Sequence, residues 1–214
     1  NKAYSTILKN ICKILKCEMK DIVNVKAIKA GLTNTSFQFE IGSQGYVYRH
    51  PGNGTSKYIN RMSEAFSMKV AAELGLDDTF IYMDENEGWK ISKFIKNARQ
   101  LDYNNRAEVD MALKMMRMLH DKKIVSKYDF GIWQKTEEFI KRLDEIGKSD
   151  FEDFKELYNT MSELKDVVMK DDNAVKCLCH NDCYSPNFLL DEDNKMYLID
   201  WEYSGNDDPA SDLG

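Results

Sequence analysis

The stretch of sequence that decides the fold is Cys177 to Asp212, CLCHNDCYSPNFLLDEDNKMYLIDWEYSGNDDPASD, near the end of the 214 residues. Two short apolar runs in it, FLL and MYLI, flank the polar turn DEDNK. Apolar runs separated by Asp, Asn and Lys indicate the two strands of a hairpin. Such a hairpin would bring Asn187, which enters it, close to Asp200, which leaves it.

Three polar side chains in this stretch have the types and the order that phosphoryl transfer needs. Asn187 comes five residues after Asp182, and Asp200 comes thirteen after Asn187. A kinase uses an Asp to accept the proton of the attacking hydroxyl, and a downstream Asn and a second Asp to hold magnesium against the nucleotide phosphates. Solvated turn carboxylates are the alternative, but three such residues beside apolar runs favour a catalytic site.

The surrounding letters narrow this match. HNDCYSPNFLL with LIDWEYSGNDDPASDLG resembles the choline/ethanolamine kinase family, particularly its bacterial LicA-type branch, within the kinase-like and aminoglycoside phosphotransferase superfamily. The resemblance implies an α+β, two-lobed protein-kinase-like fold, with an antiparallel-sheet N-lobe (residues 1–95) and a mainly helical C-lobe (residues 96–214). It also implies ATP and Mg²⁺ as cofactors, Asp182 as the catalytic base, and Asn187 and Asp200 as metal ligands.

Composition and charge are those of an ordinary globular protein of two lobes and one substantial core. Hydrophobic residues make up 43%, charged residues 31%, and the net charge is −6. That charge makes nucleic acid a poor partner and suits a small cationic substrate. No apolar run approaches the roughly 20 residues that span a bilayer, and no signal-peptide pattern opens the chain. We therefore expect a cytoplasmic protein without membrane insertion, of unknown oligomeric state.

Five cysteines raise the question of a metal site, because Cys177, Cys179, His180 and Cys183 follow one another closely. A zinc site usually pairs two separated ligand clusters, and the chain has no second one. We therefore interpret the cysteines as reduced, mostly buried thiols.

The first half of the chain has the pattern of a kinase N-lobe. A packing helix over residues 3–16 precedes a three-stranded meander over residues 22–50. The loop at its first turn resembles the family's GGxTN-type loop, with Ala30 in place of the first Gly. The resemblance implies that this loop contacts phosphate through three polar residues, Thr33, Asn34 and Thr35.

A cation and a carboxylate are expected to meet above the phosphates. Arg49 stands at the end of the third strand, where kinases carry a Lys, and its planar fork suits bidentate phosphate contact. A helix is predicted over residues 58–74, with an apolar stripe that includes Met62. Glu64 falls in the first half of this helix, from which we expect it to reach back to Arg49. A solvated strand-end Arg and a solvated helix carboxylate are the alternatives.

The remaining elements connect and complete the lobes. A second hairpin, residues 79–83 and 89–95, runs into the linker, where the resemblance places adenine contacts at Lys93, Phe94 and Ile95. Amphipathic helices are predicted over residues 104–120, 133–146 and 150–170. His120, which ends the first of them, is expected to be a capping or core residue.

Substrate recognition is assigned to residues next to the catalytic loop. A quaternary ammonium is bound by aromatic faces and carboxylates, and Tyr184, Trp201 and Glu202 are locally available; packing against the hairpin is the alternative for Trp201. In the family, helices beyond the DPASDLG segment complete the cage, and Asp207, Asp208 and Asp212 brace the loop. We therefore expect those C-terminal helices to be missing from this chain, which would make it a fragment or a protein without its substrate lobe.

The hypothesis for function is ATP-dependent phosphorylation of the hydroxyl of a small amino alcohol. Choline is the favoured substrate, which would give phosphocholine and ADP. A kinase acting on ethanolamine or an aminoglycoside is one alternative. A nucleotide-binding module without catalysis is another; missing C-terminal helices would favour it, and the presence of Asp182, Asn187 and Asp200 together argues against it.

Overall fold

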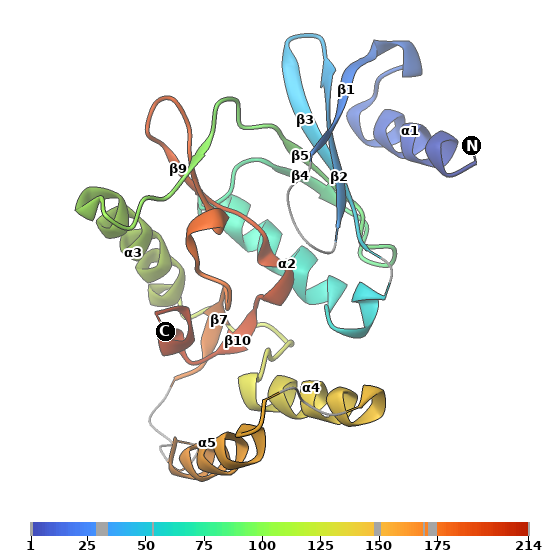
Figure 1. Ribbon diagram of the computed structural model, residues 1–214. Coiled ribbons are helices and arrows are strands. Elements are labelled where there is room, and N and C mark those ends of the chain that lie inside the picture. Colours follow the sequence, from blue (N-terminus) through green and yellow to red (C-terminus); the bar gives the residue numbers. More distant parts are fainter. Residues whose placement is uncertain are drawn as a thin grey trace.

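The computed structural model of the protein describes residues 2–28, 34–52, 54–147, 151–168, 170 and 175–213. A twisted antiparallel sheet and two helices form its first part, and helices with two small sheets form the second (Figure 1). Most of the loop predicted to contact phosphate, including Thr33, lies outside the described residues.

The first part is built on a five-stranded sheet whose neighbouring strands all run antiparallel. Its spatial order is β1-β2-β3-β5-β4, so the second predicted hairpin adds its later strand next to β3. Arg49 on β3 is thereby the register partner of Lys90 on β5. The strands are β1 (Ile22–Ile28), β2 (Thr35–Ile41), β3 (Gln44–His50), β4 (Phe80–Met83) and β5 (Lys90–Lys93).

One face of this sheet forms an aromatic core beneath the first helix, α1 (Lys2–Leu15). Ile11 of α1 is fully buried among Phe39, Tyr48 and Trp89, and the rings of Tyr48 and Trp89 stack with centroids 5.6 Å apart. Because side chains alternate across a strand, burying Tyr48 on this face sends its neighbour Arg49 to the opposite face. The predicted packing helix is thus confirmed, and it orients the cation.

The opposite face of the sheet receives α2 (Arg61–Glu73), which begins three residues later than predicted. The side chain of Asn60 accepts hydrogen bonds from the backbone of Met62 and Ser63, which fixes this start. The expected apolar stripe is wrong at Met62, which is 48% exposed, whereas Glu64 is fully buried. The buried face of α2 is therefore partly charged.

The second part carries the predicted catalytic hairpin, β8 (Phe188–Leu190) and β9 (Met196–Leu198), joined by β6 (Arg99–Gln100). The backbone N–H of Ile199 donates to the carbonyl of Asn187 at 2.9 Å, as a closed hairpin requires. A second small sheet pairs β7 (Cys177–Cys179) with β10 (Gly205–Asp207), and so places the entry and exit of the stretch side by side.

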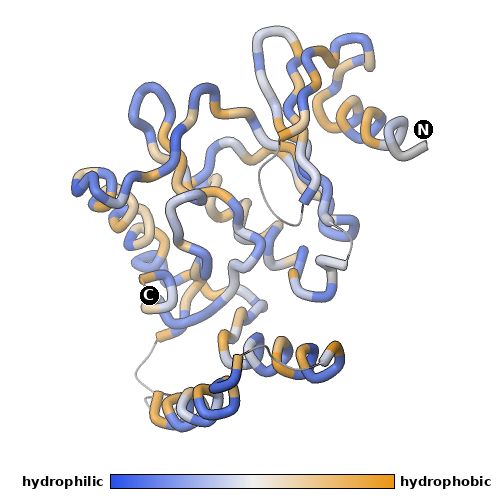
Figure 2. Tube along the Cα trace, in the orientation of Figure 1, coloured by the Kyte–Doolittle hydropathy of each residue, from blue (hydrophilic) through white to orange (hydrophobic). Residues whose placement is uncertain are grey.

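Three helices complete this part: α3 (Arg106–Asp121), α4 (Ile132–Ile146) and α5 (Phe154–Val168). Ala112, Met116 and Leu119 of α3 are buried, whereas α4 and α5 contain no buried residue. Figure 2 shows apolar positions along both helices, and Phe139 and Ile146 of α4 and Leu157 and Leu164 of α5 are exposed. No helix in the part of the chain that the structure describes is both long and apolar enough to cross a membrane.

The main apolar core joins the two parts of the molecule. It packs Ala65 and Met68 of α2 against Leu119 of α3 and against Phe188 and Leu198 of the hairpin. The core therefore runs across residue 95, where the sequence suggested a boundary between lobes. That boundary stays a prediction.

Candidate active site

The side chains of Asp182 and Asn187 meet at the start of the hairpin. The amide nitrogen of Asn187 donates to the Asp182 backbone carbonyl at 2.9 Å and to its carboxylate Oδ2 at 2.8 Å. Burial raises the pKa of Asp182, the bond from Asn187 lowers it in part, and the nearby Asp200 carboxylate raises it. The result is a pKa above the ordinary value for a group already aimed by a neighbour, as a general base requires.

A buried carboxylate from the end of the chain holds this loop in shape. The two oxygens of Asp212 accept from the backbone N–H groups of Asn181 at 2.6 Å and His180 at 3.0 Å, and from the His120 ring at 2.8 Å. Asn181 itself is left-handed, with φ of +63°. A left-handed backbone is rare outside glycine, and the hydrogen bonds to Asp212 stabilise Asn181 in this conformation.

The same carboxylate also belongs to a set of ligand-type atoms. Within the described ranges, His120, Cys179 and Asp212 are the three side chains whose donor atoms lie within 4.8 Å of one another. Burial raises the pKa of the Cys179 thiol far above its usual range, and both Asp212 oxygens already accept hydrogen bonds. A protonated thiol is a poor metal ligand. We therefore interpret the group as a brace of the loop, to which the partly buried His120 contributes through its bond to Asp212.

Asp200 lies at the other side of the site. Like Asn181, it has a left-handed backbone conformation, with φ of +67°. The Arg49 guanidinium donates to its Oδ1, and the Lys90 ammonium is 3.8 Å from the same oxygen. Burial acts to raise the pKa of Asp200, but these two cations outweigh it, and the pKa lies below the ordinary value. Asp200 is therefore a carboxylate at neutral pH.

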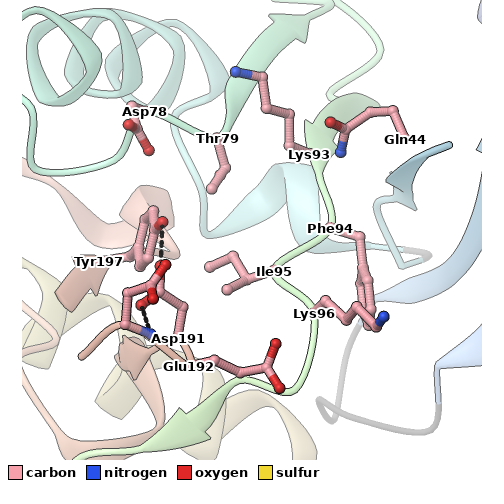
Figure 3. Close-up of a pocket in the computed structure, with 11 residues that line it drawn as sticks. Gln44, Asp78, Thr79, Lys93, Phe94, Ile95, Lys96, Asp191, Glu192 and Tyr197 are labelled. Carbon is pink, nitrogen blue, oxygen red and sulfur yellow. Dashed lines mark hydrogen bonds between the residues drawn. The ribbon is translucent and has the colours of Figure 1, made fainter. Parts of the chain in front are cut away.

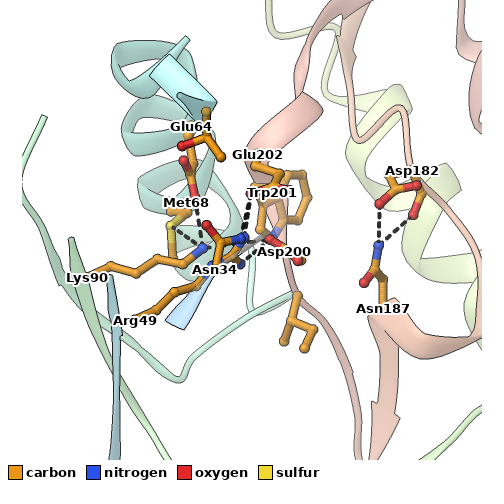
Figure 4. A network of polar contacts seen from close by, with 12 residues as sticks. Asn34, Arg49, Glu64, Met68, Lys90, Asp182, Asn187, Asp200, Trp201 and Glu202 are labelled. Carbon is orange, nitrogen blue, oxygen red and sulfur yellow. Dashed lines mark hydrogen bonds and ion pairs between the residues drawn. The ribbon is translucent and has the colours of Figure 1, made fainter. Parts of the chain in front are cut away.

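The predicted phosphate-side residues converge on Glu202. Arg49 donates to it with its second guanidinium nitrogen, and Asn34 donates to the same Glu202 oxygen at 3.2 Å (Figure 4). Thr35 pairs with His50 where β2 begins and is exposed. Burial and the charge of Asp200 raise the pKa of Glu202 more than Arg49 lowers it. Arg49 thus bridges two carboxylates, in the place where a phosphate is expected.

Glu64 reaches the site, but the expectation that it pairs with Arg49 is wrong. Its Oε1 accepts from Lys90 at 2.8 Å and its Oε2 from Arg61 at 2.7 Å. Lys90 was not among the predicted residues. An alternating strand that places a lysine between Trp89 and Ile91 was the available signal, because an inward lysine in such a strand needs a buried partner.

The structure also corrects the assignment of Trp201 to substrate. Its side chain is fully buried, its indole N–H donates to the Leu198 carbonyl at 2.9 Å, and its ring meets the edge of His180. An indole enclosed in this way offers no face to a ligand. Tyr184 is 51% exposed next to Asp182 and stays available, whereas Glu202 is occupied by Arg49.

The predicted linker residues line a cavity of about 330 Å³ (Figure 3). Lys93, Phe94 and Ile95 face Asp78, Thr79 and Tyr197 across it. The backbone N–H of Phe94 donates to Gly45 and that of Lys93 to Thr79, so neither amide is free for a base. The hairpin turn also lines this cavity, through Asp191, Glu192 and Asp193, whereas Asp182, Asn187, Asp200 and Arg49 are not among its lining residues.

The donor set fits a hard divalent cation. Asp200 Oδ2 and the Asn187 carbonyl oxygen accept no hydrogen bond from the residues whose structure is described. Figure 4 shows that Asn187 directs its amide nitrogen toward Asp182 and its oxygen away from it. Carboxylate and amide oxygens are the ligands that Mg²⁺ prefers, with water completing the shell.

Comparisons with known proteins identify relatives of this arrangement. The sequence model of a family described as Choline/ethanolamine kinase matches residues 25–214. Protein LicA of Haemophilus influenzae is 26% identical over 194 residues, which cover 86% of this chain and 54% of LicA. The chain thus spans about half the length of that curated relative.

Solved structures share the fold. A crystal structure of choline kinase LicA from Streptococcus pneumoniae matches with a TM-score of 0.80 at 23% identity, covering 100% of this chain and 73% of that one. A structure of LicA in complex with AMP matches with a TM-score of 0.78 at 23% identity, covering 96% and 70% of the two chains. The expected kinase-like architecture is confirmed.

Proposed function

This chain belongs to the choline/ethanolamine kinase family, and we propose that it transfers the γ-phosphoryl group of ATP to the hydroxyl of a small amino alcohol, choline before others. The observation that carries the proposal is the position of Asp182 and Asn187, joined by a 2.8 Å hydrogen bond, opposite an ionised Asp200 held by two cations. A proton acceptor, two oxygen ligands and a phosphate-seeking guanidinium are the parts that phosphoryl transfer needs.

Asp182 is the general base in this proposal. Its Oδ2 is fixed by the Asn187 amide, which leaves Oδ1 to accept the proton of the substrate hydroxyl. The raised pKa of Asp182 makes its carboxylate form a better proton acceptor than that of an ordinary aspartate. Tyr184, half exposed beside it, supplies an aromatic face for the cationic end of the alcohol.

Asn187 and Asp200 are the residues that would hold Mg²⁺. When bound, the ion would neutralise charge on the phosphate oxygens. Arg49 binds phosphate in the nucleotide complex by exchanging its carboxylate partners, Asp200 and Glu202, for phosphate oxygens, to which its fork is equally suited. Asn34 and Thr35, with Thr33 outside the described residues, are proposed to contact the phosphates, and Lys93 to Ile95 the adenine.

The choice of choline over ethanolamine rests on chemistry. A quaternary ammonium has no N–H to donate and is recognised by aromatic faces, of which Tyr184 is the exposed one beside the base. The family description names both alcohols. Cytoplasmic location and the absence of a nucleic-acid partner stay predictions from composition.

The test is ADP release by the purified chain with ATP and Mg²⁺ and, in parallel, choline, ethanolamine or an aminoglycoside. We expect release that depends on choline and is lost in Asp182→Asn. Stronger release with ethanolamine or an aminoglycoside would reassign the substrate. Magnesium-dependent ATP binding without release for any alcohol would refute catalysis by this chain and leave a nucleotide-binding module.

A further inference from the structure

Two cations, rather than one, project from the sheet toward the candidate site. Arg49 and Lys90 are register partners on β3 and β5, and both side chains extend from the sheet toward Asp200 (Figure 4). Like charges directly opposite each other on neighbouring strands destabilise a sheet. Their pairing therefore calls for compensation by nearby carboxylates.

The compensation is complete and divides the two cations between different partners. Lys90 donates to Glu64 of α2 at 2.8 Å, and Arg49 pairs with both Asp200 and Glu202. Arg61 takes the second oxygen of Glu64. Three cations thus face three carboxylates in one connected cluster, in which Lys90 stands between Glu64 and Asp200.

The two cations differ in how easily their partners can be exchanged. The Glu64 side chain is fully buried, with 0% of its surface exposed. The Lys90 side chain is 8% exposed, and its ammonium nitrogen lies 3.9 Å from the sulfur of Met68. Of the two partners of Arg49, by contrast, Glu202 is 9% exposed and Asp200 is 29% exposed. A buried, enclosed ion pair is costly to break, whereas a pair at an open edge can trade one oxygen for another. Lys90 is therefore the fixed cation and Arg49 the exchangeable one.

We infer that Lys90 is a positioning residue of the nucleotide site. It ties α2 to the sheet through Glu64, and its ammonium, 3.8 Å from Asp200 Oδ1, keeps the Asp200 carboxylate in place when Arg49 turns to phosphate. Lys90 acts through Asp200, without contact to the reacting atoms. The inference rests on the proposed function, since it takes Asp200 as a ligand of Mg²⁺.

The test separates metal affinity from nucleotide affinity. Lys90→Met keeps the length of the side chain and removes its charge, and we expect it to raise the Mg²⁺ concentration that half-saturates ATP binding by about 10- to 100-fold, as loss of a residue that orients a ligand does. Binding of ATP in EDTA should change little. Arg49→Met should do the reverse and weaken ATP binding even without metal. Lys69→Met, an exposed lysine of α2 paired with Glu85, is the matched control.

The opposite pattern would overturn the inference. Equal loss of ATP affinity with and without Mg²⁺ in Lys90→Met would make Lys90 the phosphate-binding cation, and no change in either would leave it without a role. Lys90→Arg restores the charge and should recover most of the metal affinity. A structural role alone would move thermal stability and leave the metal dependence unchanged.

Folding of the variant is controlled in two ways. Lys90→Met combined with Glu64→Gln removes one charge of each sign, so the buried cluster stays balanced. On the unmodified chain, side-chain nitrogen NMR should show the Arg49 guanidinium signal shifting when ATP is added in EDTA, while the Lys90 ammonium signal stays. A shift of the Lys90 signal instead would contradict the inference. Normal metal-dependent binding without ADP release would refute only the proposed function.

Discussion

At the catalytic loop, the Asp182 carboxylate is held by the Asn187 amide at 2.8 Å, and its other oxygen is free to accept a proton. Replacing Asp182 with Asn keeps the shape of the side chain and removes the base. Because general-base catalysis contributes about 10²- to 10⁴-fold, kcat should fall by that range. Steady-state kinetics with choline, beside ATP binding by calorimetry, checks this. An unchanged kcat would remove Asp182 from the mechanism.

The pH dependence of the rate should report the same carboxyl group. Burial raises the pKa of Asp182, the Asn187 bond lowers it in part, and Asp200 raises it, so that it lies above the ordinary value. The base works when deprotonated, and kcat/KM should therefore fall as pH drops through this raised pKa. A profile measured from about pH 4 to pH 9 locates the acid limb. A limb at or below the ordinary aspartate pKa of about 3.9 would disagree with the structure.

Trp201 offers a test that separates a packing role from a substrate role. Because its side chain is fully buried, Trp201→Ala should lower the free energy of unfolding by about 3–5 kcal/mol, as loss of a large core residue does. The milder Trp201→Phe should leave the KM for choline unchanged. Tyr184→Ala, at an exposed position, should do the converse. Denaturant unfolding and choline kinetics on the three variants decide the matter.

Residue spacing predicted a hairpin that brings Asn187 close to Asp200, and this hairpin forms, because the backbone N–H of Ile199 donates to the Asn187 carbonyl. The roles of Asp182, Asn187 and Asp200 stay predictions. The partner of Glu64 could not be found in that way. Lys90 meets Glu64 only because β5, and not β4, pairs with β3, and strand order is a long-range property that no local pattern encodes. For Trp201, the apolar runs beside it did not reveal that the indole is fully buried.

Among the elements, the segment that ends the chain at η5 (Pro209–Asp212) acts on the loop through one side chain. Burial acts to raise the pKa of Asp212. Hydrogen bonds from His120 and from the backbone N–H groups of Asn181 and His180 lower this pKa by more, so that it lies below the ordinary value. A carboxyl group with a lowered pKa in the folded state stabilises the fold above its unfolded pKa of about 3.9 and loses this contribution as pH falls through the folded value.

The unfolding free energy should therefore decline as the pH is lowered below about 4, and Asp212→Asn should flatten that decline. At neutral pH the variant should be less stable by about 1–3 kcal/mol, because it replaces charged hydrogen bonds in a buried place. Urea unfolding of both chains at several pH values measures this. Asp191→Asn, a partly exposed turn carboxylate with a lowered pKa, is a comparison that should affect the loop little. Identical pH dependence in Asp212→Asn and the parent would argue against the brace.

The positions of the helices could be predicted from the periodicity of apolar residues. Their ends are set by capping residues, which this periodicity does not reveal. The predicted helix over residues 58–74 starts at Arg61, since the Asn60 side chain caps it. Its predicted apolar stripe failed at Met62, and the buried face holds Glu64 instead, whose carboxylate is paired with Lys90 and Arg61. An amphipathic pattern does not identify a charged residue that is buried with its partners.

At the scale of the whole molecule, the core joins α2 with α3 and the catalytic hairpin. A sequence pattern that changes from strands to helices near residue 95 suggests two lobes, but apolar contacts ignore that boundary. Ser63 of α2 also donates to the Ser204 carbonyl at 2.7 Å. Tertiary packing of this kind has no local signature, which is why the fold class was predictable from the sequence and the shared core of α2, α3 and the hairpin was not.

Binding of nucleotide with metal should stabilise the entire molecule, since the proposed ligands come from both sides of residue 95. A ligand at about 100 times its dissociation constant adds about 2.7 kcal/mol to the free energy of unfolding. Thermal melting with ATP should therefore show a higher Tm with Mg²⁺ than with EDTA, and the difference should shrink in Asp200→Ala. Equal melting temperatures in all conditions would contradict a nucleotide site in this chain.

The balance of three cations and three carboxylates around Lys90 also has an evolutionary consequence. A single substitution there strands an opposite charge in the interior, whereas a compensated exchange of two does not. Descendants of a common ancestor should therefore alter these positions jointly, so that a lineage without Lys90 also lacks Glu64 or has gained a cation elsewhere near it. An alignment of homologues should therefore show correlated substitutions at these positions, which can be checked without an enzyme assay.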